Sequence, residues 1–371
     1  MNIVQFIEVV IPAGTTSILA ELSRALVSEG HSVTVLIARS GAHNDPLILQ
    51  RLQQSGCNVV QLGWMTNPYA VPNFWALARR TRAALQSLKP DVVHVHSYYA
   101  EQAVHFARYR GAPIIVTLHT DSPNLGGSAP QHRVRDGLAR KFYLRPDVHL
   151  VSVSAYLASR ISQTFRLGPK QVQVIHNALS KEWFDQDPLP CVRDIDILQV
   201  GRVDENKNQI YTARILAELA RRGRSFKAVI AGDGPLLPAL QEVIAQAGLS
   251  GKVCSPGRAH DARGLFRRAR IALTTSKYEA FGMVAIEALA SGAACVASDI
   301  AAHREVLNGG KFGLLLPHGD HNCWAEELGD LLDDPGRLQR LQLCGREYAE
   351  ANFSSSRFLA SYKALYRQVL R

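Results

Sequence analysis

The stretch "RIALTTSKYEAFGMVAIEALASG", residues 270–292, contains the three parts of one structural unit. Its apolar, β-branched start predicts a strand, and residues 283–291 predict a helix that ends at Gly292. Glu279 lies in the loop between them, and Glu287 lies one turn into the helix. A strand end, a glycine-containing loop and a helix N-terminus present backbone N–H groups to an anionic or polyhydroxyl ligand. The alternative is that both glutamates are solvated and form ordinary ion pairs.

Strand and helix patterns alternate on both sides of this unit, which indicates an α/β protein with parallel, doubly wound sheets. A polar segment with two prolines interrupts the alternation, which then starts again. We therefore predict two Rossmann-like domains at 1–180 and 195–353, a linker at 181–194, and a C-terminal helix at 354–371 that returns toward the first domain. The predicted strands are 2–10, 31–38, 91–96, 113–119, 149–154 and 171–177 in the first half, and 195–201, 226–234, 252–257, 271–276, 293–298 and 313–317 in the second.

Composition narrows the class of protein. The 371 residues are 47% hydrophobic and 20% charged, which is ordinary for a globular protein, and no apolar run is long enough to cross a membrane. The N-terminus looks like a first strand and not like a signal peptide. The six cysteines lack the spacing of a metal site, so we expect reduced thiols in a cytosolic protein. They are Cys57, Cys191, Cys254, Cys295, Cys323 and Cys344.

Positive charge is concentrated in the first half of the chain. The formal net charge is +10, with +8 in residues 1–180 and +2 in residues 181–371. Such a surface favours nucleic acid, an anionic membrane face or a phosphorylated ligand. Arg79, Arg80 and Arg82, which lie off the apolar stripe of a predicted helix, could meet an anionic membrane or could simply be solvated.

Loops after the strands of the second half carry further candidates, because ligands of open α/β sheets bind at the carboxyl ends of strands. Arg202 and Lys207 follow the strand 195–201, where two cations beside a helix start suit a diphosphate. Gly232 and Gly234 let the backbone approach a ligand closely, and Arg258 follows a later strand. The dinucleotide fingerprint GxGxxG is absent, which disfavours an NAD oxidoreductase.

Three features of the first half are candidates as well. Gly14 lies in the loop after the first strand, and His119 closes the strand 113–119. His94 and His96 alternate on one strand and point to the same face, but no acidic third ligand is nearby, so a metal site is disfavoured.

Taken together, "VGRVDENKNQ", "AGDGPL", "YEAFGMVAIEALASG" and "VTLHT" resemble the retaining glycosyltransferases of family 4, which have the GT-B fold of two Rossmann-like domains facing a cleft. The spacing Glu279-x7-Glu287 matches the signature of that family. The resemblance implies an acceptor-side first domain and a second domain that binds a nucleoside-diphosphate sugar. It also implies that Glu279 holds the sugar hydroxyls and that Glu287 accepts hydrogen bonds from the ribose. Backbone N–H groups of the intervening loop would bind the sugar and phosphate; these belong to Phe281, Gly282 and Met283.

The resemblance also implies how the leaving group is stabilised. Arg202 and Lys207 would neutralise the departing diphosphate, and His119 would lie beside the anomeric carbon. The only DxD sequence, residues 194–196, lies at the start of a strand and therefore at its wrong end, so we expect no metal and no cofactor. Two departures from the family pattern, "PAGTT" around Gly14 and "HNA" at 176–178, concern the first domain and not the donor motifs.

We therefore expect a retaining, metal-independent hexosyltransferase-type enzyme of cell-surface glycan or glycolipid synthesis. Its partners would be a nucleoside-diphosphate sugar and a sugar or lipid-linked acceptor, with no nucleic acid. We expect it in the cytoplasm, with peripheral attachment to the inner face of an anionic membrane as an open alternative. A nucleotide-sugar epimerase of the same fold and a basic nucleic-acid-binding protein are the competing functions.

Overall fold

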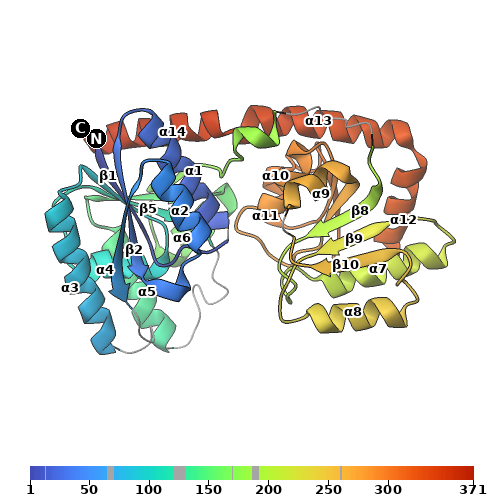
Figure 1. Cartoon of the computed structure of the whole chain (residues 1–371), viewed down its shortest axis with the longest axis horizontal. Coiled ribbons are helices and arrows are strands. Elements are labelled where there is room, and N and C mark those ends of the chain that lie inside the picture. The colour runs from blue at the N-terminus through green and yellow to red at the C-terminus, as the bar shows by residue number, and fades with distance from the viewer. Residues whose placement is uncertain (13, 65–70, 121–129, 169, 186–191, 260) are drawn as a thin grey trace. The chain divides into compact units, whose positions relative to one another are not determined.

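The computed structural model describes the chain except residues 13, 65–70, 121–129, 169, 186–191 and 260, and the side chains of 71–74 and 130–135. The chain forms two compact units (Figure 1). Unit 1 comprises Met1–Ala178 and Ser355–Arg371, and unit 2 comprises Leu179–Ser354. The predicted linker therefore begins inside unit 2, where Lys181–Trp183 form a short 3-10 helix, η2.

Unit 1 is built on a parallel seven-stranded sheet of order β3-β2-β1-β4-β5-β6-β7. Its strands are β1 (Asn2–Ile7), β2 (Ser32–Arg39), β3 (Asn58–Trp64), β4 (Val92–Val95), β5 (Ile114–Leu118), β6 (Val148–Ser152) and β7 (Val172–Val174). Its helices are α1 (Gly14–Ser28), η1 (Gly41–His43), α2 (Pro46–Gln54), α3 (Val71–Leu88), α4 (Tyr98–Phe106), α5 (Pro130–Tyr143), α6 (Ala155–Phe165) and α14 (Ser355–Val369). Helix α1 packs with α2 and α14, while α3 packs with α4 and α5 with α6.

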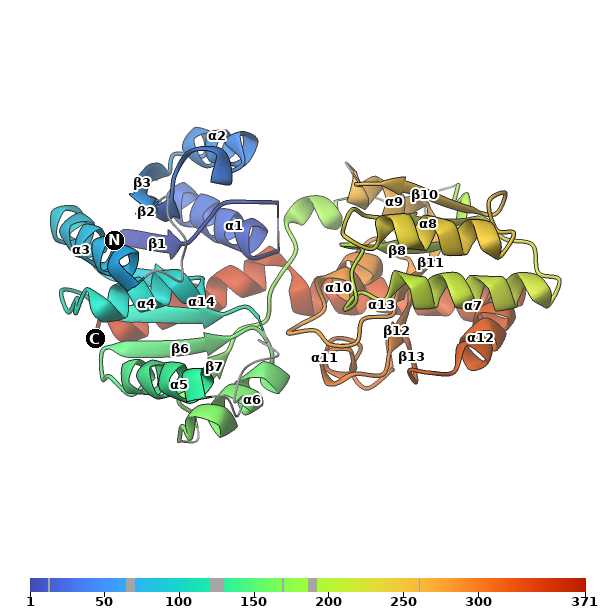
Figure 2. The same cartoon turned by 90° about the horizontal axis from the view of Figure 1, so that it is seen from below.

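Unit 2 is built on a parallel six-stranded sheet of order β10-β9-β8-β11-β12-β13. Its strands are β8 (Ile195–Val200), β9 (Ala228–Ala231), β10 (Val253–Gly257), β11 (Ala269–Thr274), β12 (Ala294–Ser298) and β13 (Leu314–Leu316). Its helices are α7 (Gln209–Arg221), α8 (Leu237–Gln246), α9 (Ala262–Arg268), α10 (Met283–Ala290), α11 (Ala301–Val306), α12 (His321–Asp333) and α13 (Pro335–Phe353). Helix α7 packs with α8 and α12, and α10 packs with α9, α11 and α13 (Figure 2).

Burial explains the composition of the strands. All five residues of β12 are buried, as expected for a parallel sheet whose two faces are both covered by helices. In unit 2 the largest core side chain is Trp324 of α12, which belongs to the same buried cluster as Ile215 and Leu219 of α7. The apolar strands and the helix faces opposite them therefore form one core in this unit.

The α/β class and the parallel, doubly wound architecture predicted from the sequence are confirmed. Strand β3 was not predicted, because Asn58–Trp64 is a half-buried edge strand that contains Gly63. Helices α12 and α13 were not predicted either, although α13 is the longest helix of unit 2. The predicted strand–loop–helix unit at 270–292 is confirmed, and Gly292 ends α10 in a left-handed conformation with φ 68°.

Each sheet contains one point at which the direction of winding reverses. In unit 2 this point lies between β8 and β11, and in unit 1 it lies between β1 and β4. At such a point the loops leaving the two strands diverge and leave room for a ligand at the carboxyl ends. No helix in the described part of the chain combines the length and apolarity that a membrane span requires.

Candidate functional site

The loops that follow β8 and β11 are joined to each other at the carboxyl edge of the unit 2 sheet. Asn206 makes three hydrogen bonds between the two loops. Its side chain donates to the Tyr278 carbonyl (3.1 Å) and accepts from the Tyr278 N–H (3.1 Å). Its backbone carbonyl accepts from the Lys277 N–H (2.8 Å). Asp204 shapes the first loop by accepting from the backbone N–H groups of Asn206 and Lys207. The two loops therefore form one rigid surface.

Lys207 and Glu279 form an ion pair across this surface. Both side chains are largely removed from solvent, with 24% and 15% of their area exposed. Lys207 is held in place because its carbonyl accepts from Gln199 Nε2 and Thr275 Oγ1, each at 3.1 Å. The cation from one loop meets the carboxylate from the other because the two loops leave the neighbouring parallel strands β8 and β11.

The start of α10 adds backbone donors to the pair. Gly282 precedes the helix with φ 105°, a left-handed conformation that favours glycine, and it offers no side chain to cap the helix. Phe281 is buried against Phe353 with its ring centroid at 5.8 Å, which anchors the turn, and Met283 is the first residue of the helix. The positive end of the helix dipole therefore lies at the same loop as Glu279.

Glu287 lies one turn inside α10. Desolvation raises the pKa of its carboxyl to about 7, although the nearby Lys207 ammonium acts in the opposite direction. A carboxyl of this kind changes charge near neutral pH, and so its binding strength depends on pH. Perturbed carboxyls of this kind are common in functional sites.

The structure adds His303, which the sequence did not indicate. It is fully buried on α11, its Nδ1 donates to the Ser298 carbonyl at 2.9 Å, and its Nε2 has no hydrogen-bond partner among the described residues. A Cβ placed on Gly282 would approach its ring carbon Cδ2 to 3.2 Å, so the ring packs directly behind the turn. Only the folded chain brings residue 303 to this loop, and no local pattern could have identified it.

Gly232 and Gly234 have a structural role that the sequence did not suggest. A Cβ on Gly232 would lie 1.8 Å from the Gly201 carbonyl oxygen. A Cβ on Gly234 would lie 2.2 Å from the Val203 carbonyl oxygen. These glycines therefore permit close contact between two loops of the protein itself. The prediction that they allow a ligand to approach stays a prediction.

The two predicted arginines are more exposed than Lys207. Arg202 has 72% of its side chain exposed and lies 3.6 Å from Asp204, and Arg258 is exposed in the loop after β10. Arg258 follows β10, which β9 separates from β8 in the sheet, so its loop is not adjacent to the loop of Lys207 in strand order. Arg202 lies in the same loop as Lys207 and is therefore a better candidate than Arg258 for a diphosphate contact.

Gly14 and His119 belong to unit 1. Gly14 is the exposed first residue of α1, and His119 directly follows β5. His119 Nε2 lies 3.1 Å from His96 Nδ1, and desolvation lowers the pKa of His119 to about 4, so that its imidazole is neutral at physiological pH.

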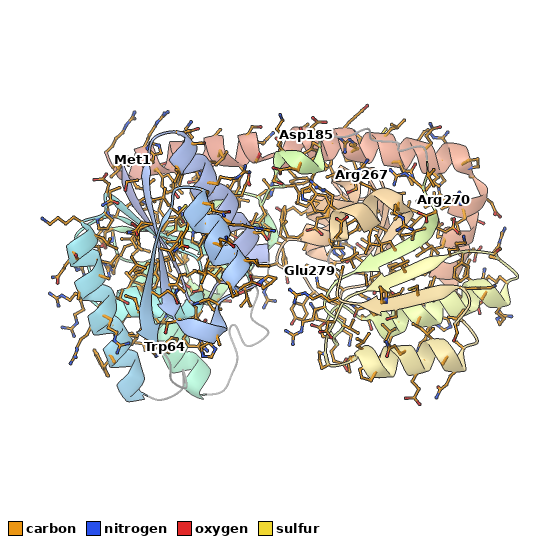
Figure 3. The ribbon with its side chains drawn as sticks, viewed as in Figure 1. Met1, Trp64, Asp185, Arg267, Arg270 and Glu279 are labelled. Atoms are coloured by element: carbon orange, nitrogen blue, oxygen red, sulfur yellow. The ribbon has the colours of Figure 1, made fainter. Side chains whose placement is uncertain are left out.

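The carboxylates of the DxD sequence are already paired at the opposite end of the sheet. Asp194 binds Arg268 and Asp196 binds Arg270, at the start of β11. Arg270 lies in β11, whereas Glu279 lies in the loop after it, and Figure 3 shows the two residues on opposite sides of unit 2. Within the described residues, no three His, Cys, Asp or Glu side chains gather in a way that could hold a metal ion.

Two family models match consecutive parts of the chain. Residues 12–183 match "Glycosyltransferase Family 4", and residues 181–348 match "Glycosyl transferases group 1". The two matches together cover most of both units, so the likeness is not confined to a single motif.

Two relatives match this chain over nearly its full length. A glycogen synthase of Mycobacterium tuberculosis is 27% identical over 90% of this chain and 85% of its own, and an N-acetyl-alpha-D-glucosaminyl L-malate synthase of Bacillus anthracis is 23% identical over 95% and 93%.

Solved structures share the architecture. A glycosyltransferase of Rickettsia africae superimposes with a TM-score of 0.82 at 17% identity, covering 100% of this chain and 98% of its own. Anabaena HepE, in complex with UDP and glucose, superimposes with a TM-score of 0.77 at 19% identity, covering 98% and 99%. The fold is thus the GT-B fold, and with the family models and the paired Lys207 and Glu279 we conclude that the chain belongs to glycosyltransferase family 4.

Proposed function

We propose that this glycosyltransferase moves a sugar from a nucleoside-diphosphate sugar to a hydroxyl acceptor, with retention of anomeric configuration and without a metal ion. The observation that carries the proposal is the Lys207–Glu279 pair at the start of α10, because it places a cation, a carboxylate and the N-terminus of a helix within one loop surface. A sugar diphosphate needs each of these groups at adjacent positions.

Within this proposal each group has one task. Lys207 and Arg202 stabilise the negative charge that grows on the diphosphate as it leaves, and the N–H groups at the start of α10 assist them. Glu279 accepts hydrogen bonds from the sugar hydroxyls and keeps the Lys207 ammonium directed at the phosphate. Glu287 accepts from the ribose, and His119 contacts the transferred sugar.

Metal independence is supported by two features of the chain. The carboxylates of residues 194–196 are held by Arg268 and Arg270 at the far end of the sheet, and cations occupy the loop where a metal would otherwise act. The charge of the leaving group can therefore be balanced by side chains.

UDP is the first nucleotide to test, since HepE is in complex with UDP and glucose. Thermal unfolding should be followed with UDP, GDP and ADP in the presence of EDTA. We expect one of them to raise the melting temperature, by an amount equivalent to roughly 2.7 kcal/mol at a hundredfold excess over Kd. Lys207→Ala should lose the shift. A shift with none of the three, or a shift that requires Mg²⁺ or Mn²⁺, would contradict the proposal.

We also propose a cytoplasmic enzyme that attaches reversibly to anionic membrane and glycosylates a lipid-linked acceptor there. All five described cysteines are free thiols, as is typical of a reducing compartment. Arg79 and Arg82 are exposed on α3, and Trp75 of the same helix has 52% of its surface exposed although its ring packs edge-on against Phe106. Exposed arginines beside an aromatic residue suit a lipid headgroup surface.

A further inference from the structure

A continuous network of hydrogen-bonded side chains adjoins His119 in unit 1. It connects β1, β4 and β5 to the C-terminal helix α14, and apart from His119 every member is buried. The members are Gln5, His94, His96, Thr117, His119, Tyr362 and Tyr366. Because buried polar atoms need partners, each donor in the network must face an acceptor.

One branch of the network runs from Gln5 to His119. Gln5 Oε1 lies 2.5 Å from His96 Nε2, and since an amide oxygen only accepts, His96 must carry its proton on Nε2. His96 Nδ1 is then a lone pair. His119 Nε2, at 3.1 Å from it, must donate, which leaves the lone pair of His119 on Nδ1.

The other branch runs in a consistent direction. Gln5 Nε2 donates to the Tyr366 hydroxyl at 3.1 Å, so Tyr366 donates its own proton to His94 Nδ1 at 2.8 Å. His94 Nε2 then donates to Thr117 Oγ1 at 2.7 Å, which in turn lies 3.0 Å from the Tyr362 hydroxyl. Turning the Gln5 amide by 180° would reverse every bond in both branches, so this one amide sets the direction of the network.

In this arrangement the imidazoles of His94 and His96 must be neutral. A proton added to His96 Nδ1 would oppose the N–H of His119, and a proton added to His94 Nδ1 would oppose the hydroxyl proton of Tyr366. Burial acts in the same sense, since it lowers the pKa of His94 and of His96 well below the ordinary value.

We infer that Gln5, acting through His96, holds His119 in the neutral tautomer protonated at Nε2, so that His119 offers the transferred sugar a hydrogen-bond acceptor at Nδ1. Among the described residues, His119 Nδ1 has no hydrogen-bond partner. The group that binds there must therefore be a donor, such as a sugar hydroxyl, and His119 cannot supply a proton to the leaving group. The tautomer rests on the network alone, whereas the sugar contact rests on the proposed function.

The tautomer can be measured on the ligand-free protein by NMR with ¹⁵N-labelled histidine. We expect His119 to show a protonated Nε2 and an unprotonated Nδ1 across neutral pH. In Gln5→Leu we expect both tautomers of His119, because the amide oxygen that orders the branch is gone. Tyr362→Phe, which removes a hydroxyl at the far end of the other branch, is the matched control and should leave His119 unchanged. A wild-type His119 protonated at Nδ1, or a mixture of tautomers, would overturn the inference whether or not the variants fold.

Activity provides a second readout, with consumption of UDP-glucose, GDP-mannose or ADP-glucose as the probe. His96→Phe should slow consumption roughly tenfold, and His96→Asn should restore it, because the Asn amide oxygen can replace Nδ1 as the acceptor. Equal rates in the two variants would contradict a positioning role for His96. Consumption of no donor by the wild-type protein would instead refute the proposed function and leave the tautomer measurement intact.

Discussion

The proposed chemistry depends most on Lys207. This cation of the β8 loop is shielded from solvent, and it forms an ion pair with Glu279, the predicted sugar ligand. A second Lys–Glu pair joins the same two loops, since Lys277 lies 3.2 Å from Glu205, but both of those side chains are mostly exposed. An exposed pair contributes little, whereas a charge in a desolvated site interacts strongly with a leaving diphosphate.

Lys207→Ala should therefore reduce kcat by about a hundredfold, which corresponds to about 2.7 kcal/mol of transition-state stabilisation. Arg202→Ala should also reduce turnover, and to a smaller extent because its side chain is exposed. Lys277→Ala is the matched control and should keep near-normal rates. Steady-state kinetics in EDTA would decide: normal rates in both Lys207→Ala and Arg202→Ala are incompatible with leaving-group stabilisation by side chains.

Glu287 leads to a prediction about pH. Its pKa is raised from the ordinary carboxyl value to about 7, so the folded protein binds a proton there that the unfolded chain releases near pH 4.5. Ionising Glu287 therefore costs stability as pH rises from 4.5 to about 7. In the absence of ligand, Glu287→Gln should be more stable than the wild-type protein at pH 8, by about 1–3 kcal/mol, and the difference should vanish below the unfolded pKa of 4.5.

The same residue should control nucleotide affinity in the opposite sense. Only the ionised carboxylate of Glu287, which destabilises the free protein, accepts hydrogen bonds from the ribose hydroxyls without donating one. The affinity for a nucleoside diphosphate should therefore rise between pH 6 and 8. This rise should be smaller in Glu287→Gln. Because the phosphate titrates equally in both proteins, the difference between the two profiles isolates Glu287. Identical profiles from calorimetric titration would show that the ribose assignment is wrong.

The loops and helix starts reveal which parts of the site the sequence could predict. The strand–loop–helix unit at 270–292 follows local patterns of hydrophobicity and glycine, and its prediction was confirmed. Asn206 and His303 were missed because their roles arise from contacts with residues 72 and 21 positions away, Tyr278 and Gly282. Likewise the hydrogen-bond partners of the buried Tyr366, which are Gln5 and His94, lie 361 and 272 positions away in the sequence.

The glycine after β9 supports a prediction about loop packing. Gly232→Ala would place a methyl group against the Gly201 backbone, which cannot move without distorting the Lys207 loop. We expect a loss of more than about 2 kcal/mol in unfolding free energy together with weaker nucleotide binding. Gly251→Ala is the matched control, since a Cβ there would meet nothing within 4 Å. Chemical denaturation of the two variants measures the difference, and equal stability would show that the two loops can separate at little cost.

At the scale of the whole molecule, the two halves of the chain differ in net charge. The first half, which contains α3, is the more basic one. Arg80 is not available for a membrane in the way that the sequence suggested, because its guanidinium donates to the carbonyls of Leu62 and Gly63 at 2.9 and 2.7 Å. The exposed cations of this helix segment that remain for a headgroup surface are Arg79 and Arg82.

Co-sedimentation with vesicles separates these arginines. The wild-type protein should bind vesicles that contain phosphatidylserine, should not bind neutral vesicles, and should dissociate at high salt. Changing Arg79 and Arg82 to Gln should weaken binding about tenfold or more, since each arginine near such a surface contributes about 1 kcal/mol. Arg222→Gln, in unit 2, is the control for general loss of charge. Equal binding to neutral vesicles, or none to either kind, would favour a soluble acceptor.

The central claim is that this chain transfers sugar with retention and with side chains in place of a metal. Real-time ¹H NMR of the anomeric proton tests it most directly, with UDP-glucose, GDP-mannose and ADP-glucose offered in EDTA and water as the acceptor. The account predicts that one donor is consumed, that the first sugar released has the α configuration of the donor, and that added Mn²⁺ does not change the rate. Release of the β anomer first, consumption that requires the metal, or consumption of none of the donors would contradict it.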